Sequence, residues 1–276
     1  MIRRTALALM VTLFAAPLTL QARETPEPVG ESFVLGSAVM GKDRELNVLL
    51  PDGYEADGPG YPVIYVLDGG QEQDFPAYAA MIRQAARDDE MQPAIVVGVA
   101  SEDRQNELTE RARDRQILSR WPNHGESERF RRFLAEEVQP WVAARYRLNG
   151  EDAVLGESAA ALFIVEAFLE QPTLFDRYLA ISPSLWWDRE ALSKRAAELL
   201  ARHPAGDRLL LLSIADEGGQ MQSGMNRLLQ ALGRRTPEGL TWRYHPRHDL
   251  EHSTIYQAVA PIFVREAFPV TETPAQ

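Results

Sequence analysis

Apolar runs typical of buried strands recur along the chain and alternate with segments of helical periodicity. These runs occupy residues 61–67, 94–100, 153–155, 178–181 and 209–214. An amphipathic segment over about residues 75–88 separates the first two runs. Strands that are apolar on both faces belong to parallel sheets that are covered by helices on either side. The pattern therefore predicts an α/β fold with a mostly parallel central sheet and helices on both faces.

The remaining segments complete this arrangement without any internal repeat. Alternating polar and apolar residues from Ser32 to Leu50, around a turn at Gly41-Lys42-Asp43, predict an N-terminal antiparallel hairpin. Further helices are expected at residues 130–141, 189–202, 219–233 and 253–267, with a strand at 240–245. Because no boundary divides these elements, we expect one domain over residues 32–270.

Residues 101–129 differ from the rest of this domain because they are strongly charged and show no clear period. Loops of this length without secondary structure are uncommon, and they are either functional or mobile. We therefore interpret the segment as an insertion and as a candidate lid.

Residues 1–22 have the pattern of a secretory signal peptide. Arg3 and Arg4 precede an apolar run from Ala6 to Leu20, and cleavage is expected after Ala22. A membrane anchor is the alternative, but a spanning helix needs roughly 20 apolar residues, more than this run contains. We therefore expect an exported protein, periplasmic or secreted, without stable membrane insertion after cleavage. Residues 23–31 are expected to form a flexible leader, and residues 271–276 a disordered tail.

The composition excludes several classes of partner and chemistry. The formal net charge is −11, and it becomes −13 once residues 1–22, with their two arginines and no acids, are removed. Nucleic acid is therefore not expected as a partner, and an anionic membrane surface is disfavoured. The chain contains no cysteine, which excludes disulfides, thiolate nucleophiles and cysteine-ligated metals. The oligomeric state does not follow from the composition.

A serine stands at a strand-to-helix corner in the segment from Ala153 to Phe163. The apolar strand runs into Gly156, Ser158 follows two positions later, and small residues then open an apolar helix. This is the layout of a nucleophile elbow, G-x-S-x-G, with Ala160 in place of the last glycine. Small neighbours are needed because the backbone folds back on itself there. The alternative is that Ser158 simply caps the helix.

Partners for Ser158 are expected where other strands end, because the carboxyl ends of parallel strands meet at one edge of the sheet. Asp216 and Glu217 follow the run 209–214, and His252 follows the strand at 240–245. The chain order of nucleophile, acid and histidine matches the α/β-hydrolase arrangement. A serine needs an imidazole to accept its proton, and an acid orients that imidazole. The two acids could also be solvated loop charges.

An oxyanion also needs hydrogen-bond donors. One donor is the backbone N–H of Ala159, the residue after the nucleophile, and the other is expected from the Asp68-Gly69-Gly70 loop, at Gly70. His245, His248 and His252 could suggest a metal site, but no metalloprotease motif accompanies them. We therefore expect no metal and no organic cofactor.

The chain resembles the esterases of the α/β-hydrolase superfamily that include the ferri-siderophore (enterobactin and salmochelin) esterases and, more distantly, the esterase D group. The resemblance extends over about residues 32–268. It rests on the motifs Val66-Leu67-Asp68-Gly69, Asn106-Glu107-Leu108-Thr109, Gly156-Glu157-Ser158 and Ser182-Pro183-Ser184-Leu185-Trp186-Trp187-Asp188. Glu157, Ala160 and Glu110 depart from the siderophore esterases, which often carry histidine, glycine and proline there.

The resemblance implies an α/β-hydrolase with Ser158 as nucleophile, His252 as base and Glu217, or its neighbour Asp216, as acid. It predicts an exported serine carboxylesterase that acts on a small-molecule ester through an acyl-serine intermediate, with a siderophore-type ester as one candidate. There are two alternatives. One is an acyltransferase that uses the same serine, and the other is a non-catalytic periplasmic binding protein with this fold.

Three further residues are candidates for substrate binding. Trp186 and Trp187 follow a strand that should end near Ser158, although adjacent side chains cannot both face one pocket, so one of them is expected in the core. Arg104 could receive an anionic or catecholate group. The acids interleaved with the arginines of residues 101–129 favour a self-compensated, solvated loop instead.

Overall fold

The structure is a computed structural model that describes residues 28–270. The predicted signal peptide, most of the predicted leader and the predicted tail lie outside the described residues. The end of the leader is held in place, since the backbone of Val29 exchanges two hydrogen bonds with the Gln71 side chain and the first strand begins at Glu31.

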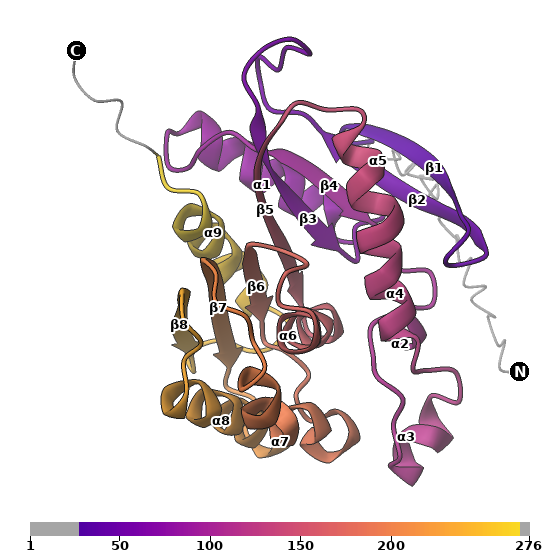
Figure 1. The fold of residues 1–276 in the computed structure, drawn as a ribbon, viewed down its shortest axis with the longest axis vertical. Helices are drawn as coiled ribbons and strands as arrows, with labels where there is room; N and C mark the ends of the chain where they lie inside the picture. Colours follow the sequence, from indigo (N-terminus) through magenta and orange to yellow (C-terminus); the bar gives the residue numbers. More distant parts are fainter. Residues whose placement is uncertain (1–27, 271–276) are drawn as a thin grey trace, which may run out of the picture.

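One eight-stranded sheet forms the centre of the molecule, with its strands in the order β1-β2-β4-β3-β5-β6-β7-β8 (Figure 1). In sequence these strands are β1 (Glu31–Ser37), β2 (Lys42–Leu49), β3 (Tyr61–Leu67), β4 (Ile95–Val99), β5 (Leu148–Glu157), β6 (Arg177–Ile181), β7 (Arg208–Ala215) and β8 (Leu240–Arg247). The β1-β2 hairpin is antiparallel, β2 pairs antiparallel with β4, and all other neighbours are parallel. The predicted α/β-hydrolase fold with an N-terminal hairpin is confirmed.

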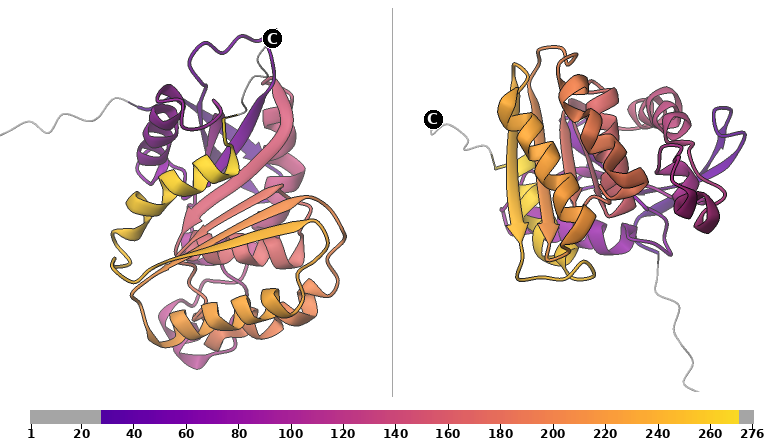
Figure 2. Two further views of the ribbon diagram at one scale, coloured as in Figure 1. Left: turned by 90° about the vertical axis from the view of Figure 1, so that its left-hand side faces the viewer. Right: turned by 90° about the horizontal axis from the view of Figure 1, so that it is seen from below.

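Helices cover both faces of the sheet (Figure 2). One face packs against α1 (Phe75–Arg87) and α9 (Ile255–Ala267). The other is covered by α4 (Ser127–Phe133), the π-helical turn η1 (Leu134–Val138), α5 (Gln139–Ala143), α6 (Ala159–Glu170), α7 (Trp187–Leu200) and α8 (Gly219–Arg234). Successive residues of β3 face opposite layers, Tyr65 one and Ile64 the other. Both faces of these strands are buried, and this explains why their apolar residues are consecutive rather than alternating with polar ones.

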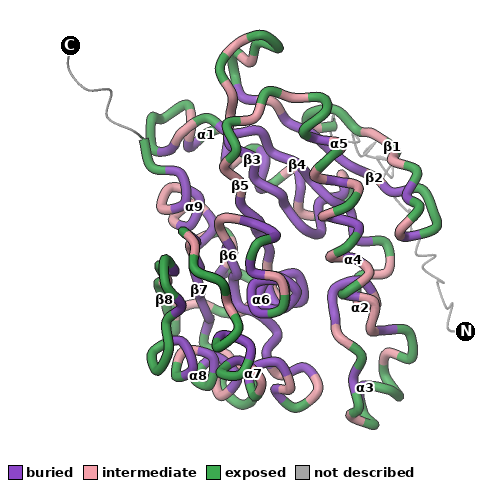
Figure 3. The backbone as a smooth tube through the Cα atoms, in the orientation of Figure 1, coloured by how far each residue is buried: buried purple, intermediate pink, exposed green. Residues whose placement is uncertain are grey.

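Helix α6, which begins directly after Ser158, is buried over nearly all of its length. All of its residues from Ala159 to Leu169 are buried, as the tube in Figure 3 shows. Such a helix cannot shift without disturbing the core on every side. It therefore gives Ser158, which immediately precedes it, a rigid support.

The segment 101–129 is more ordered than its sequence pattern indicates. It contains α2 (Arg104–Glu107) and α3 (Arg115–Arg120), and α4 begins at Ser127. Helices α2 and α3 are too short to produce a visible hydrophobic period, and α4 begins three residues before the helix expected at 130–141. Within residues 28–270, none of the helices combines the length and hydropathy required to span a bilayer.

Candidate active site

Ser158 occupies a strained corner between β5 and α6. Its φ is +60° and its ψ is −114°, and its backbone N–H donates to the carbonyl of Ile181 on the neighbouring strand at 3.0 Å. A Cβ on Gly156 would lie 2.7 Å from the Cβ of Ala160. Glycine at position 156 is therefore what makes room for the alanine that replaces the last elbow glycine. The Ser158 side chain makes no capping hydrogen bond, so the helix-cap alternative does not hold.

The structure brings three of the predicted residues into one hydrogen-bonded series. Ser158 Oγ lies 3.0 Å from His252 Nε2, and His252 Nδ1 lies 2.9 Å from Glu217 Oε1. Glu217 follows β7, and His252 lies in the loop between β8 and α9. Asp216, the alternative acid, is exposed to solvent. Glu217 is therefore the acid that this geometry selects.

The electrostatics of this series suit an imidazole base. The hydrogen bond that His252 Nδ1–H donates to Glu217 raises the pKa of His252 above its ordinary value of 6.5, although partial burial works in the opposite direction. Glu157, beside the nucleophile, is also affected, because burial raises the pKa of its carboxyl to about 7. A neutral His252 with Nδ1–H directed at Glu217 leaves Nε2 free to accept the Ser158 proton.

Two hydroxyl groups that we did not predict contact the ends of this series. Ser182 Oγ donates to Glu217 Oε1 at 2.5 Å and accepts the backbone N–H of Ala215 at 3.1 Å. Ser184 Oγ lies 3.3 Å from Ser158 Oγ. Both serines belong to the Ser182-Pro183-Ser184 motif that carried the family resemblance, and this motif was the available signal.

The predicted role of Gly70 as an oxyanion donor does not fit the geometry. Its N–H donates to Gln73 Oε1 at 3.0 Å. The neighbouring N–H groups are also engaged, that of Gly69 with the Val99 carbonyl at 2.9 Å and that of Gln71 with Glu45 Oε1 at 3.0 Å. Ala159 is different, because the first N–H groups of a helix have no partner within it.

Arg104 lies at the site and is held there by Asp68. Its Nε donates to Asp68 Oδ2 at 2.7 Å, and its Nη2 lies 3.5 Å from the carbonyl oxygen of Glu157. Asp68 is buried at the end of β3, with a φ of +52°. The Arg104 side chain is 42% exposed, so a cation anchored in the fold is also accessible to a substrate. Arg104 is thus exposed and charge-compensated, as the prediction of a self-compensated, solvated loop has it, but its partner is the buried Asp68 after β3 and not an acid of residues 101–129.

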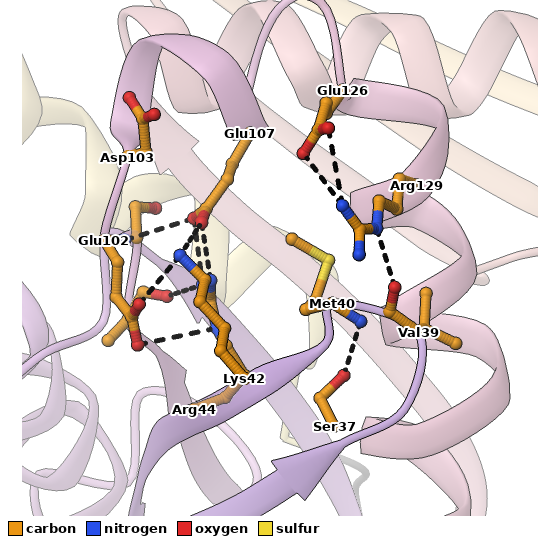
Figure 4. Close-up of polar contacts among 12 residues, drawn as sticks. Ser37, Val39, Met40, Lys42, Arg44, Glu102, Asp103, Glu107, Glu126 and Arg129 are labelled. Carbon is orange, nitrogen blue, oxygen red and sulfur yellow. Dashed lines mark hydrogen bonds and ion pairs between the residues drawn. The ribbon is translucent and has the colours of Figure 1, made fainter.

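A buried ion pair supports the helix that carries Arg104 (Figure 4). Arg44 of β2 donates to both carboxylate oxygens of Glu107, at 2.5 and 2.9 Å, and to the carbonyl of Ala100 at 2.6 Å. Both side chains are almost completely buried. Burial alone would raise the pKa of Glu107, but Arg44 and Lys42 outweigh it and hold the pKa below its usual 4.5. Glu107 is the last residue of α2, one turn from Arg104.

The two predicted tryptophans have different environments. Trp187 is buried, and its Nε1–H donates to the carbonyl of Glu110 at 2.9 Å. Trp186 is partly exposed and lines a cavity of about 220 Å³ together with Trp121 and Arg120. The ring centroids of Trp121 and Trp186 are 5.9 Å apart, and the Arg120 guanidinium lies 4.5 Å from the Trp121 centroid. Trp186 is therefore the candidate for substrate contact, and Trp187 belongs to the core.

The histidines near the end of β8 do not gather around one point. His252 faces Ser158, whereas His245 Nε2 lies 3.2 Å from Glu266. Among residues 28–270, no group of three or more His, Asp or Glu side chains is arranged to hold a metal ion.

The fold and the serine-histidine-glutamate arrangement place the chain among the α/β-hydrolases. A family model described as "Putative esterase" matches residues 37–249, which is more than half of the chain. The chain therefore belongs to this esterase family.

Two curated proteins illustrate the relationship. Ferri-bacillibactin esterase BesA of Bacillus subtilis is 30% identical over 152 residues, which cover 49% of this chain and 52% of that protein. Siderophore enterobactin esterase of Emericella nidulans is 36% identical over 81 residues, 28% of this chain and 27% of that protein. The chain thus matches about half of the length of the first relative and less of the second.

Solved structures share the fold over a larger part of the chain. The BES protein from Bacillus cereus has a TM-score of 0.77 and 22% identity, covering 92% of this chain and 100% of that chain. An IroE-like serine hydrolase from Shewanella oneidensis has a TM-score of 0.77 and 24% identity, covering 86% of this chain and 79% of that chain. At these identities the likeness establishes the fold.

Proposed function

We propose that this protein is a serine carboxylesterase that cleaves a small-molecule ester through an acyl-serine intermediate. The observation that carries the proposal is the hydrogen-bonded series from Ser158 through His252 to Glu217. Membership of the esterase family supports the same reaction class. Because residues 1–22 have the pattern of a signal peptide, we also propose that the enzyme acts after export, in the periplasm or outside the cell.

In the first half of the reaction, His252 Nε2 accepts the Ser158 proton as Oγ attacks the ester carbonyl. A tetrahedral intermediate forms, and its oxyanion needs donors placed in advance. When this intermediate collapses, the imidazolium gives its proton to the departing alcohol and leaves an acyl-Ser158. In the second half, His252 removes a proton from water as the water oxygen attacks the acyl carbonyl. Collapse of this second tetrahedral intermediate breaks the bond to Oγ and releases the carboxylic acid, while the imidazolium returns the proton to Ser158.

We assign the two oxyanion contacts to the Ala159 N–H and the Arg104 guanidinium. The N–H groups of the loop after β3 already have acceptors, whereas Arg104 is accessible and fixed by Asp68 at 2.7 Å. A guanidinium stabilises developing negative charge more strongly than a neutral N–H does. Asp68 limits the motion of Arg104, so little reorganisation is needed when the charge appears.

The cavity lined by Trp186, two residues after Ser184, supports a substrate with aromatic or anionic groups. Trp121 and Trp186 offer ring faces, and Arg120 adds a cation next to them. Two relatives are esterases named for ferri-bacillibactin and enterobactin. We therefore propose a siderophore-type ester as the substrate, with this cavity as the place where part of it binds.

The test compares hydrolysis of a ferric siderophore trilactone with hydrolysis of p-nitrophenyl acetate and butyrate by the purified protein. We expect kcat/KM for the trilactone to exceed that for the simple esters, and Ser158→Ala to abolish both activities. Hydrolysis of simple esters alone would contradict the substrate but not the reaction class. No hydrolysis of any ester by the folded protein would contradict the proposed function.

A further inference from the structure

We propose that Ser184 is a further catalytic residue, whose hydroxyl donates a hydrogen bond to the nucleophilic oxygen of Ser158 while that oxygen carries negative charge. This inference rests on the proposed function, because it assigns a role within the same serine site.

Ser184 is fixed against Ser158 by two contacts. Its backbone N–H donates to the carbonyl of Ser158 at 3.0 Å, and its Oγ lies 3.3 Å from Ser158 Oγ. The residue is 7% exposed, so solvent has little access to its hydroxyl. A hydroxyl held in this way beside a reacting atom is a preorganised donor rather than a mobile surface group.

The direction of the hydrogen bond follows from counting protons. Ser158 has a single hydroxyl proton, and base catalysis requires it to point at His252 Nε2, 3.0 Å away. The Ser158 oxygen can then only accept from Ser184, whose own proton serves as donor. As His252 removes the Ser158 proton, negative charge grows on Oγ, and the contact with Ser184 strengthens. Ser184 keeps its proton throughout, so no transfer to or from it is required.

The same contact acts in both halves of the reaction. Charge grows on Ser158 Oγ during attack, and it returns to Oγ when the acyl-enzyme is hydrolysed and Oγ becomes the leaving atom. A donor at Oγ therefore lowers the barrier to acylation and the barrier to deacylation. Its loss should reduce kcat as well as kcat/KM, with little change in KM.

The local backbone explains how Ser184 reaches this position. β5 and β6 are parallel neighbours with Glu157 opposite Ile181, so the residues after the two strands end side by side. Ser182 then has a φ of +45°, and its N–H is held by the Ser213 carbonyl at 3.0 Å. Positive φ at a residue other than glycine is costly and persists where the surroundings impose it. This strained turn brings Ser184 across to Ser158.

The experiment compares Ser184→Ala, Ser184→Thr and Ser193→Ala with the wild type. Ser193 provides the matched control, because it is buried in α7 and its hydroxyl has no hydrogen-bond partner within the described residues. We expect Ser184→Ala to reduce kcat by at least about tenfold. The loss should stay below the roughly 100-fold reduction in kcat that follows the loss of an oxyanion donor. Its rate of labelling by a fluorophosphonate should fall by a similar factor. Ser184→Thr should recover most of both losses, and Ser193→Ala should behave like the wild type.

Two results would overturn this inference alone. In the first, the wild type is labelled and Ser184→Ala matches it within twofold in both kcat and labelling rate. In the second, Ser184→Ala and Ser184→Thr lose activity to the same extent, although thermal unfolding shows both variants to be folded. The hydroxyl group would then not be responsible for the loss. A wild type that neither hydrolyses esters nor reacts with the fluorophosphonate would overturn the proposed function itself.

Discussion

The Nδ1 atom of His252 lies 2.9 Å from Oε1 of Glu217, and that same oxygen accepts the Ser182 hydroxyl at 2.5 Å. The carboxylate is therefore held from two sides, and its side chain is only 7% exposed. A carboxylate fixed in this way holds the imidazole in one tautomer and one orientation. The neighbouring Asp216 points to solvent and makes no such contact.

This relationship predicts a sharp difference between two adjacent acids. Glu217→Gln should lower kcat/KM by on the order of 10³-fold or more, because the amide no longer stabilises the correct imidazole tautomer or the imidazolium. Asp216→Asn should stay within about twofold of the wild type. Steady-state hydrolysis of p-nitrophenyl butyrate measures both, and comparable losses in the two variants would contradict the assignment of Glu217.

The pH dependence of kcat/KM follows from the shifted pKa of His252. His252 acts as a base only when it is neutral, so activity is lost as the pH falls through its pKa. Because Glu217 raises that pKa above 6.5, the acidic limb of the profile should have its inflection above pH 6.5. The residual activity of Glu217→Gln should show an inflection at lower pH. An inflection unmoved by this substitution would contradict the coupling.

Glu157 provides a control for that profile, because burial raises the pKa of its carboxyl to about 7 and it therefore titrates in the same range. Its charge also contributes to the raised pKa of His252, but less than the hydrogen bond that His252 donates to Glu217. Glu157→Gln should therefore retain the acidic limb and move it to slightly lower pH. Disappearance of the limb in this variant would instead identify Glu157 as the group that titrates.

The pair formed by Arg104 and Asp68 predicts a defect in kcat. Arg104→Lys should reduce kcat by roughly 10²- to 10³-fold, because the compact lysine ammonium lacks the planar fork with which a guanidinium binds Asp68 on one side and reaches the oxyanion on the other. Asp68→Asn should give a smaller loss in the same direction, since Arg104 would remain but less firmly held. Arg132→Lys, at an exposed pair with Glu136, is the control and should leave kcat unchanged. Unchanged kcat in Arg104→Lys would return the oxyanion role to the loop N–H groups.

The Arg44–Glu107 pair predicts a large effect on stability (Figure 4). Glu107→Gln should lower the free energy of unfolding by about 3–5 kcal/mol, because it removes the buried counter-charge of Arg44 and leaves only the partly exposed Glu102, 3.9 Å from Arg44 Nε. Glu126→Gln, at the half-exposed pair with Arg129 in the same region, should cost less than about 1 kcal/mol. Urea unfolding at pH 7 measures the difference, and equal effects would contradict it. Since the pKa of Glu107 is lowered on folding, the stabilisation that its charge provides is lost as the pH falls below about 4.5. The loss of stability caused by Glu107→Gln should therefore become smaller in that range.

Most of the fold could be predicted because its signals are local. Continuous apolar runs marked β3, β4 and β7, and the turn at Gly41 marked the hairpin, since burial and turn geometry act on neighbouring residues. The strand-to-helix corner at Ser158 was visible for the same reason. The structure then placed His252 and Glu217 beside it, as their positions after strands indicated.

What the sequence pattern missed depends on contacts between distant segments. Glu107 looked like a solvated loop acid, and only its pairing with Arg44, 63 residues away, makes it a buried one. The Gly70 N–H looked free, but the Gln73 side chain folds back to accept it. Ser182 and Ser184 carry no periodic signal, and their contacts arise because two strands end side by side. None of these relationships is encoded in the spacing of residue types along the chain.

The most direct test of the central claim is the intact mass of the protein after treatment with a fluorophosphonate, for the wild type, Ser158→Ala and His252→Ala. An activated serine predicts a single phosphonyl adduct on the wild type, none on Ser158→Ala, and a labelling rate lowered by several orders of magnitude in His252→Ala. A folded wild type that forms no adduct, or a Ser158→Ala variant that is labelled as fast as the wild type, would contradict the account.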